Sequence, residues 1–263
     1  MSAAPRAATV LWCGDSRGQD GHNVTAIRVE IMLAEADAAG HGTREKTLLP
    51  RLRSEERARY HAFTAAARRL SWLGGRALLL DALEAVLGEA DPAALVTGDE
   101  GGVRYLAAEL HLNLSHSGDF FAVALAPLPV GVDLERRRPR AVAGQAARLF
   151  CTREAARLAE LGGDTQLEAF YRLWTLKEAA CKAAQLSVWD GLRHACFDMD
   201  EGRARLEAPF PPGEWHFLHT AFPSHWQLAA ALRGGDPEWR CRRRTLRGGW
   251  TELPLTGAGF LQG

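Results

Sequence analysis

The chain has 263 residues, 47% of them hydrophobic and 24% charged, a balance typical of a globular protein rather than a disordered one. Its 32 basic residues equal its 32 acidic residues, so the formal net charge is +0 and we expect no nucleic-acid partner. The 5 cysteines include no CxxC pair, which argues against a disulfide framework or a zinc ribbon and favours a reducing, cytoplasmic compartment.

The longest apolar stretch, residues 120–132, contains two prolines. It is shorter than the about 20 residues that a membrane helix needs. The N-terminal residues do not follow the pattern of a signal peptide. We therefore expect no membrane partner, and we expect a monomer.

The first half of the chain is expected to contain a strand at residues 24–33 and then helical sequence. Ser54 is followed by two glutamates, which is typical of a helix start because a hydroxyl caps the helix and acids complement its dipole. From Leu70 to Leu87, apolar residues recur at steps of three and four, which predicts an amphipathic helix.

The rest of the chain alternates short strands with one more long helix. The alternating pattern and the turn residues between the apolar runs predict strands at 110–114, 120–126 and 130–135, a turn at 115–119, a helix at 165–186, and a hairpin of strands 215–220 and 225–232. The tail after Gly234 has no clear pattern. Both halves follow a long helix with short strands, which indicates either a duplication or two unrelated α+β halves.

Asp133 and Glu135 are candidate metal ligands in the segment Gly131-Val132-Asp133-Leu134-Glu135. Residues two apart in a strand point the same way, so the two carboxylates project together. Paired carboxylates repel each other unless a positive charge lies between them, and Mg²⁺ is a hard ion that takes such oxygens. A polar, half-exposed edge strand explains this segment equally well.

Glu178 and Lys182 lie on one face of the second predicted helix, together with Trp174, at steps of four residues. Glu178 is a candidate third metal ligand, and Lys182 could supply a positive charge for phosphate. A surface Glu–Lys pair explains the same spacing. Ser115 and His116 lie in a predicted turn of small residues. Backbone N–H groups in such a turn could bind an anion. An ordinary hairpin loop explains the same residues.

These three segments together resemble the Sfp-type family of 4′-phosphopantetheinyl transferases. The matching signatures are Asn113-Leu114-Ser115-His116, Gly131-Val132-Asp133-Leu134-Glu135 and Trp174-x-x-Lys177-Glu178-Ala179-x-x-Lys182, with Gly75-Arg76-Ala77-Leu78-Leu79 upstream. The resemblance covers residues 51–232. It implies an α+β fold of two similar subdomains with pseudo-twofold symmetry, each a small antiparallel sheet packed on a long helix. The expected divisions are 1–127, which would bind coenzyme A, 128–235, which would bind the metal, and a tail, 236–263.

The resemblance also implies an activity, which is Mg²⁺-dependent transfer of phosphopantetheine from coenzyme A to a serine of an acyl or peptidyl carrier protein. By position, Asp133, Glu135 and Glu178 match metal ligands, and Lys182 matches a lysine near the pyrophosphate. The resemblance also gives roles to four more residues: Ser115, His116 and Arg59 in binding coenzyme A, and Glu154 as a base. The family usually has a lysine in a segment that precedes the one containing Asn113, and this chain lacks it. Arg104, in the aligned segment, could supply the phosphate contact instead.

The sequence leaves three alternative functions open. One is a module that binds coenzyme A or a nucleotide without transfer, and another is a different Mg²⁺-dependent phosphoryl-transfer enzyme. The third is an interaction domain that uses two arginine clusters, residues 136–140 and 242–244. Carrier proteins are typically acidic, so the same clusters could dock a carrier, or they could be solvated loop charge.

Overall fold

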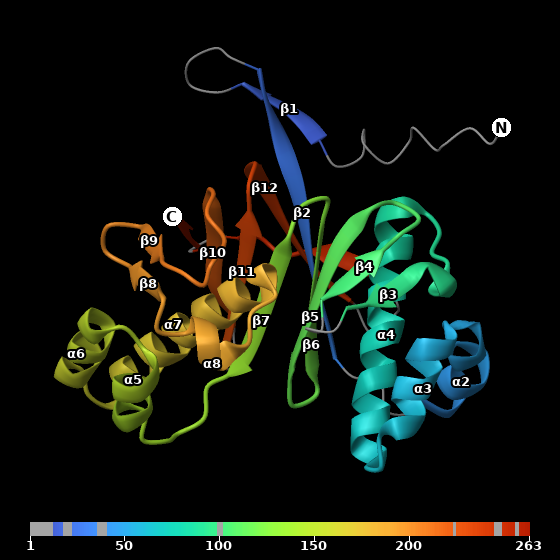
Figure 1. The fold of residues 1–263 in the computed structure, drawn as a ribbon, viewed down its shortest axis with the longest axis horizontal. Coiled ribbons are helices and arrows are strands. Elements are labelled where there is room, and N and C mark those ends of the chain that lie inside the picture. The colour runs from blue at the N-terminus through green and yellow to red at the C-terminus, as the bar shows by residue number, and fades with distance from the viewer. Residues whose placement is uncertain are drawn as a thin grey trace.

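The chain forms two β-sheets with helices on their outer sides (Figure 1). This is a computed structural model that describes residues 13–17, 23–35, 41–98, 102–222, 225–244, 249–255 and 258–263. The predicted mixture of α and β elements is confirmed. Within the described ranges, no helix combines the length and the apolar character that crossing a bilayer requires.

The first sheet contains most of the strands of the first half. In order across the sheet, its strands are β13 (Trp250–Glu252), β12 (Asp236–Arg244), β2 (Asn23–Glu35), β6 (Phe120–Ala126), β5 (Leu110–Ser117), β4 (Val103–Tyr105) and β3 (Leu95–Thr97), with β1 (Cys13–Arg17) paired to β2. Neighbours are antiparallel except β12 and β2, which are parallel.

The second sheet belongs to the second half of the chain. In order, its strands are β7 (Val130–Arg136), β11 (Trp226–Arg233), β10 (Trp215–Phe222), β14 (Gly259–Gln262), β9 (Arg203–Leu206) and β8 (Ala195–Asp198). Only the β14–β9 pair is parallel. The edge strand β7 lies beside β5 of the first sheet, so the two sheets meet at the centre of the molecule (Figure 1).

Each sheet is covered by one long helix of 22 residues and by shorter ones. Beside the first sheet are α2 (His41–Thr47), α3 (Ser54–Ala62) and α4 (Ala66–Leu87), with 3₁₀ turns η1 (Leu49–Arg51) and η2 (Pro92–Ala94). Beside the second are α5 (Ala143–Leu149), α6 (Thr152–Glu160), α7 (Gly163–Ala184) and α8 (Val188–Gly191). The helical sequence after Ser54 is interrupted because Phe63 and Ala65 are extended, which separates α3 from α4.

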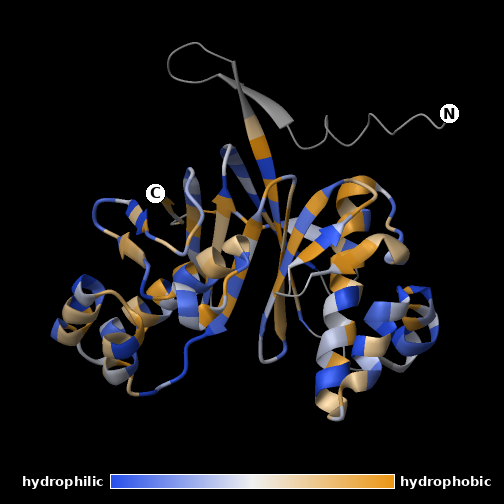
Figure 2. Cartoon of the chain, in the orientation of Figure 1, coloured by the Kyte–Doolittle hydropathy of each residue, from blue (hydrophilic) through white to orange (hydrophobic). Residues whose placement is uncertain are grey.

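Three apolar clusters form the core. One lies between α4 and the first sheet, and another lies between α7 and the second sheet. The third joins the two sheets and includes Ile31, Ala124, Val132 and Leu228. Figure 2 shows the central strands as mainly hydrophobic and the outer helices as mixed. Because side chains alternate along a strand, β7 turns Val132 and Leu134 toward the third cluster and leaves its other face for α7.

The tail, residues 236–263, adds strands to both sheets, which the sequence did not predict. Strand β12 pairs with β2 from Asp236 opposite Ala26 onward, and β14 pairs with β10. A parallel pair between segments some two hundred residues apart has no local pattern, so sequence periodicity cannot reveal it. The division of the chain at residues 127/128 and 235/236 stays a prediction.

Candidate active site

The site is built on β7 and on the helix that crosses it. Gly131 allows this crossing, because a Cβ at that position would lie 2.1 Å from Ala179 O and 2.6 Å from Ala183 N of α7. No side chain fits in such a space. The close approach brings Lys182, in the last turn of α7, against Asp133 of β7. Glu135 lies two residues further along the strand, on the same face as Asp133.

Lys182 and Glu178, one turn apart on α7, meet Asp133 at this crossing. Lys182 Nζ lies 2.6 Å from Asp133 Oδ1 and 3.5 Å from Glu178 Oε2. The ammonium also donates to the Val132 carbonyl at 3.2 Å. The Asp133 side chain is only 3% exposed, whereas those of Glu178 and Lys182 are 16% and 23% exposed, so the cluster is buried at Asp133 and open to solvent at α7.

The three carboxylates influence one another electrostatically. Burial, the charge of Asp133 and that of Glu135 raise the pKa of Glu178 to about 7, although Lys182 opposes the shift. The pKa of Glu135 is also raised, by burial and by Asp133. Burial alone would lower the pKa of Lys182, but Asp133 and Glu178 outweigh it and raise that pKa. The structure thus brings together four of the predicted residues in a cluster with more carboxylates than cations.

The donor set fits a hard divalent cation. Asp133 Oδ2 is buried and has no hydrogen-bond partner among the described residues. A buried carboxylate oxygen without a partner is costly, and a cation bound there would remove that cost. Three carboxylates supply oxygen ligands only, which suits Mg²⁺ better than metals that prefer sulfur or imidazole.

Polar side chains of β5 hold β7 in place from the other side. The N–H groups of Val132, Leu134 and Arg136 donate to Asn113 Oδ1 at 2.9 Å, Ser115 Oγ at 3.2 Å and Ser117 Oγ at 3.3 Å, respectively. In turn, the Ser115 hydroxyl donates to Asp133 Oδ1 at 2.8 Å and the Ser117 hydroxyl donates to Glu135 Oε2 at 2.9 Å. Sequence reasoning missed the positioning roles of Asn113 and Ser117, although their period-two spacing with Ser115 was visible.

The predicted turn at residues 115–119 is wrong in its first part. Strand β5 continues through Ser117, with Ser115 opposite Ala122 and His116 opposite Phe121. The backbone there pairs with β6, so it cannot form the predicted nest of free N–H groups. The prediction fails because serine and glycine favour turns. In this fold, the Ser115 and Ser117 hydroxyls instead accept hydrogen bonds from N–H groups of β7, as backbone carbonyls of a neighbouring strand would.

The other predicted contacts of coenzyme A, at residues 59, 104 and 116, make their contacts with side chains outside the carboxylate cluster or are exposed. His116 is exposed, and its ring packs edge-on against Phe121 at 5.5 Å. Arg59 is exposed on α3. The Arg104 guanidinium contacts His111 Nε2 at 2.8 Å, and burial together with the charge of Arg104 lowers the pKa of His111 to about 4.

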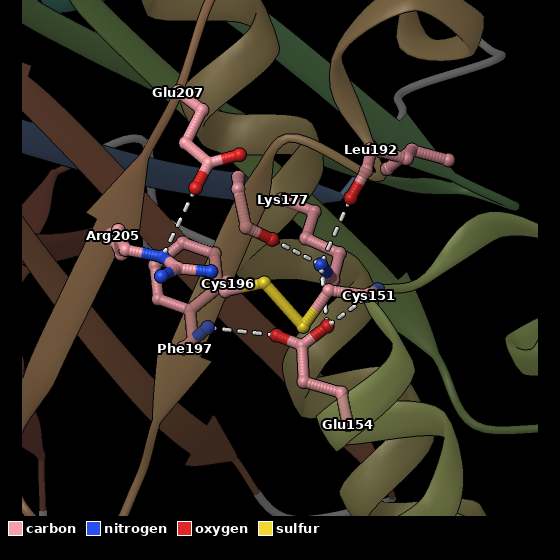
Figure 3. Close-up of a disulfide and its surroundings, with 9 residues drawn as sticks. Cys151, Glu154, Lys177, Leu192, Cys196, Phe197, Arg205 and Glu207 are labelled. Carbon is pink, nitrogen blue, oxygen red and sulfur yellow. Dashed lines mark hydrogen bonds and ion pairs between the residues drawn. A yellow bond between two sulfur atoms is a disulfide. The ribbon is translucent and has the colours of Figure 1, made fainter.

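Glu154 belongs to a different, buried network (Figure 3). Its carboxylate forms an ion pair with Lys177 at 2.6 Å and accepts the N–H of Phe197 at 2.7 Å and that of Cys151 at 3.3 Å. Glu154 is 4% exposed and Lys177 is fully buried. A carboxylate whose oxygens are occupied in this way favours a structural role over that of a base. Lys177 lies 23 residues after Glu154 in the sequence, so no local pattern predicts this ion pair.

Cys151 and Cys196 form a disulfide, although the sequence argued against a disulfide framework. The two residues are 45 positions apart, and the fold brings their Cα atoms to 6.0 Å. Such a pairing has no local signature, and it removes the cysteine argument for a reducing compartment. Cys181 and Cys241 are free and buried.

The two arginine clusters differ in how far they are engaged within the chain. Arg242 pairs with Glu30 at 3.1 Å, Arg243 pairs with Glu35 at 2.9 Å, and Arg244 pairs with Asp81. In the cluster at 136–140, by contrast, residues 136, 138 and 140 are exposed. The guanidinium of Arg140 lies over the ring of Tyr171 at 4.9 Å.

Comparison with known proteins identifies the family. Residues 129–241 match the sequence model of the 4′-phosphopantetheinyl transferase superfamily. The chain is 30% identical over 169 residues to the 4′-phosphopantetheinyl transferase HetI of Nostoc sp., covering 61% of this chain and 71% of that protein. The chain belongs to the 4′-phosphopantetheinyl transferase superfamily. The segment matched by the family model contains β7 and α7, which carry the carboxylate cluster.

Two further relatives are matched over a smaller part of their length. The chain is 40% identical over 125 residues to 4′-phosphopantetheinyl transferase AcpT of Salmonella typhimurium, covering 46% of this chain and 62% of AcpT. It is 32% identical over 123 residues to a 4′-phosphopantetheinyl transferase of Bacillus subtilis, covering 45% of this chain and 54% of that protein. The chain therefore spans somewhat less than two thirds of the length of these two relatives.

Proposed function

We propose that the chain transfers the 4′-phosphopantetheine group of coenzyme A to a serine of an apo carrier protein and releases 3′,5′-ADP. One observation carries the proposal: at the β7–α7 crossing, Asp133 and Glu178 both contact Lys182, the charges of Asp133 and Glu135 raise the pKa of Glu178, and Asp133 Oδ2 is buried without a partner among the described residues. Membership of a family whose relatives are named 4′-phosphopantetheinyl transferases supports it independently.

Asp133, Glu135 and Glu178 would hold Mg²⁺. When bound, the ion would neutralise charge on the phosphoryl oxygens and orient the diphosphate. Lys182 would add a second positive charge beside the diphosphate, and it is held in place by Asp133 and Ser115. The β5 hydroxyls would keep the carboxylates fixed before substrate arrives.

In the transfer itself, the carrier serine oxygen forms a bond to the phosphorus that carries pantetheine, and the P–O bond to the 3′,5′-ADP group breaks. The serine proton passes to a carboxylate. Glu154 is already paired with Lys177, so we assign this step to Glu178, which is more exposed than Asp133. We keep Arg59, Arg104 and His116 as proposed contacts of coenzyme A.

The test is the mass of an apo carrier protein incubated with the chain, coenzyme A and Mg²⁺. Wild type should add the mass of phosphopantetheine, and Asp133→Ala should lose this activity while staying folded by circular dichroism. Glu160→Ala, an exposed carboxylate at the end of α6, is the matched control and should transfer normally. Near-normal transfer by Asp133→Ala would contradict the metal-ligand assignment.

The same assay separates the alternatives. Coenzyme A that binds without any carrier mass shift would indicate a binding module. Release of 3′,5′-ADP without a carrier would indicate a different phosphoryl-transfer reaction.

We propose that an acidic carrier docks on the exposed arginines of residues 136–140 rather than on residues 242–244, which are paired within the chain. Arg136 is the last residue of β7, the strand that carries Asp133 and Glu135, and residues 137–140 directly follow it. Because surface charge is screened by salt, raising the salt concentration should raise KM for the carrier more than for coenzyme A. Equal sensitivity of the two values would contradict electrostatic docking.

We also propose that the two halves are related by a pseudo-twofold axis, a proposal that the equal lengths of α4 and α7 support. Superposition of α4 and its sheet on α7 and its sheet tests it. The cytoplasmic location and the monomeric state stay predictions.

A further inference from the structure

Cys151 and Cys196 lie where small molecules can reach them. Cys151 is the N-cap residue of α6, and Cys196 is in β8. Both are partly exposed, and both line a surface cavity of about 640 Å³. Neither cysteine belongs to the carboxylate cluster at the β7–α7 crossing. Paired cysteines that are accessible in this way can exchange with thiols and disulfides in solution.

The disulfide joins the two segments that hold the Glu154 carboxylate. On one side, the N–H of Cys151 itself donates to Glu154 Oε2 at 3.3 Å. On the other, the N–H of Phe197, the residue after Cys196, donates to Oε1 at 2.7 Å. Figure 3 shows the carboxylate beside the sulfur–sulfur bond. Opening that bond therefore frees the two donors of Glu154 to move relative to each other.

Glu154 in turn positions α7 through Lys177. The Lys177 ammonium is fully buried, forms its ion pair with Glu154 at 2.6 Å, and donates to the carbonyls of Leu192 at 2.9 Å and of Ala195. A buried ammonium must keep its partners, because leaving it unpaired is strongly unfavourable. Lys177 directly precedes Glu178 in α7, so the placement of Lys177 is also the placement of Glu178.

We propose that Cys151 and Cys196 are a thiol–disulfide exchange site whose substrate is a small-molecule disulfide, and that its redox state changes the alignment of α7 at the carboxylate cluster. The effect on transfer rests on the proposed function, whereas the exchange and the movement of α7 do not.

The exchange balances in two steps. The Cys151 thiolate attacks one sulfur of the small disulfide, forms a mixed disulfide and releases one small thiolate. The Cys196 thiolate then attacks the Cys151 sulfur of that mixed disulfide, closes the protein disulfide and releases the second small thiolate. The two cysteines lose two electrons and two protons in total, and the small disulfide gains them and becomes two thiols.

The first test counts free thiols by mass. The full chain is equilibrated with dithiothreitol or with oxidised glutathione, unfolded, and alkylated with N-ethylmaleimide. The oxidised sample should carry two fewer adducts than the reduced one. In Cys151→Ser the protein disulfide cannot close, so at most one adduct should be lost, as a mixed disulfide on Cys196. Cys241→Ala, which replaces a buried cysteine of β12, should keep the loss of two adducts. Equal adduct counts in the two wild-type samples would overturn the exchange site.

The second test measures α7 directly. Amide hydrogen exchange of residues 174–182 should differ at least about fivefold between the oxidised and the reduced wild type, which is the low end for two coupled sites. The difference should disappear in Cys151→Ser and in Cys196→Ser. An unchanged exchange rate, despite two fewer adducts, would overturn the link to α7.

Transfer is measured on the same samples and should also differ at least about fivefold between the two states. If neither state transfers phosphopantetheine but exchange in α7 still differs, the proposed function fails and the redox site stands. If both states transfer equally while α7 changes, the link between α7 alignment and the reaction is overturned.

Discussion

Gly131→Ala tests the crossing of β7 and α7 with the smallest possible change. A methyl group at this position would lie 2.1 Å from Ala179 O and 2.6 Å from Ala183 N. Both atoms belong to the helix backbone, which cannot rotate away as a side chain can. To restore ordinary contact distances, α7 must move away from β7 by about 1 Å.

This movement has two measurable consequences. Overpacking of this kind typically costs about 1–3 kcal/mol of unfolding free energy. A misplacement of about 1 Å at a catalytic site can lower a rate by about 10²-fold, because Glu178 and Lys182 would withdraw from Asp133. We therefore expect a moderate loss of stability and a far larger loss of transfer.

Chemical denaturation and carrier mass analysis measure the two effects on the same sample. Gly144→Ala is the matched control, since a Cβ on this α5 glycine meets nothing within 4 Å. It should leave transfer unchanged and stability equal or slightly higher, as alanine favours helix. If Gly131→Ala keeps both wild-type stability and wild-type transfer, the close crossing described above is incorrect.

Three further predictions concern single side chains. Lys182→Met should lower transfer by about 10²-fold with the fold intact by circular dichroism, because it removes the cation beside Asp133, and an unchanged rate would exclude that role. Glu154→Gln should cost about 3–5 kcal/mol in chemical denaturation, because it leaves Lys177 charged and buried, and adding Lys177→Met should recover part of the loss; no recovery would argue against the ion pair. Burial, and next the charge of Arg172, lower the pKa of His219 from 6.5 to about 4. Between pH 4 and pH 6.5, the unfolded chain therefore binds more protons at His219 than the folded chain does. The stability that neutral His219 contributes is fully present above pH 6.5 and is lost on acidification. We expect the free energy of unfolding to fall by about 2 kcal/mol from pH 7 to pH 5. His219→Gln should flatten this part of the stability curve, and an equally steep curve would refute the assignment.

The parts of the site that the sequence predicted are those set by local periodicity. Alternation along β7 was enough to place Asp133 and Glu135 on one face, and a spacing of four residues was enough to place Glu178 and Lys182 together on α7. The elements that carry them lie close to their predicted bounds. These patterns did not predict that α7 would cross β7.

The parts that the sequence missed depend on contacts between distant segments. Glu154 meets Lys177, and Cys151 meets Cys196, only because α6, α7 and β8 pack together. Ser115 belongs to a strand, since its hydroxyl takes over a hydrogen bond that strand β7 would otherwise seek from a backbone carbonyl. Local propensity favours a turn at that residue, and tertiary pairing decides otherwise.

The most direct measurement of the central claim is a crystal structure of the chain with coenzyme A and Mn²⁺, which shares the preference of Mg²⁺ for oxygen ligands and scatters anomalously. We predict one anomalous peak within coordination distance of Asp133, Glu135 and Glu178, next to the diphosphate. A peak elsewhere, or a diphosphate bound away from the β7–α7 crossing, would contradict the account.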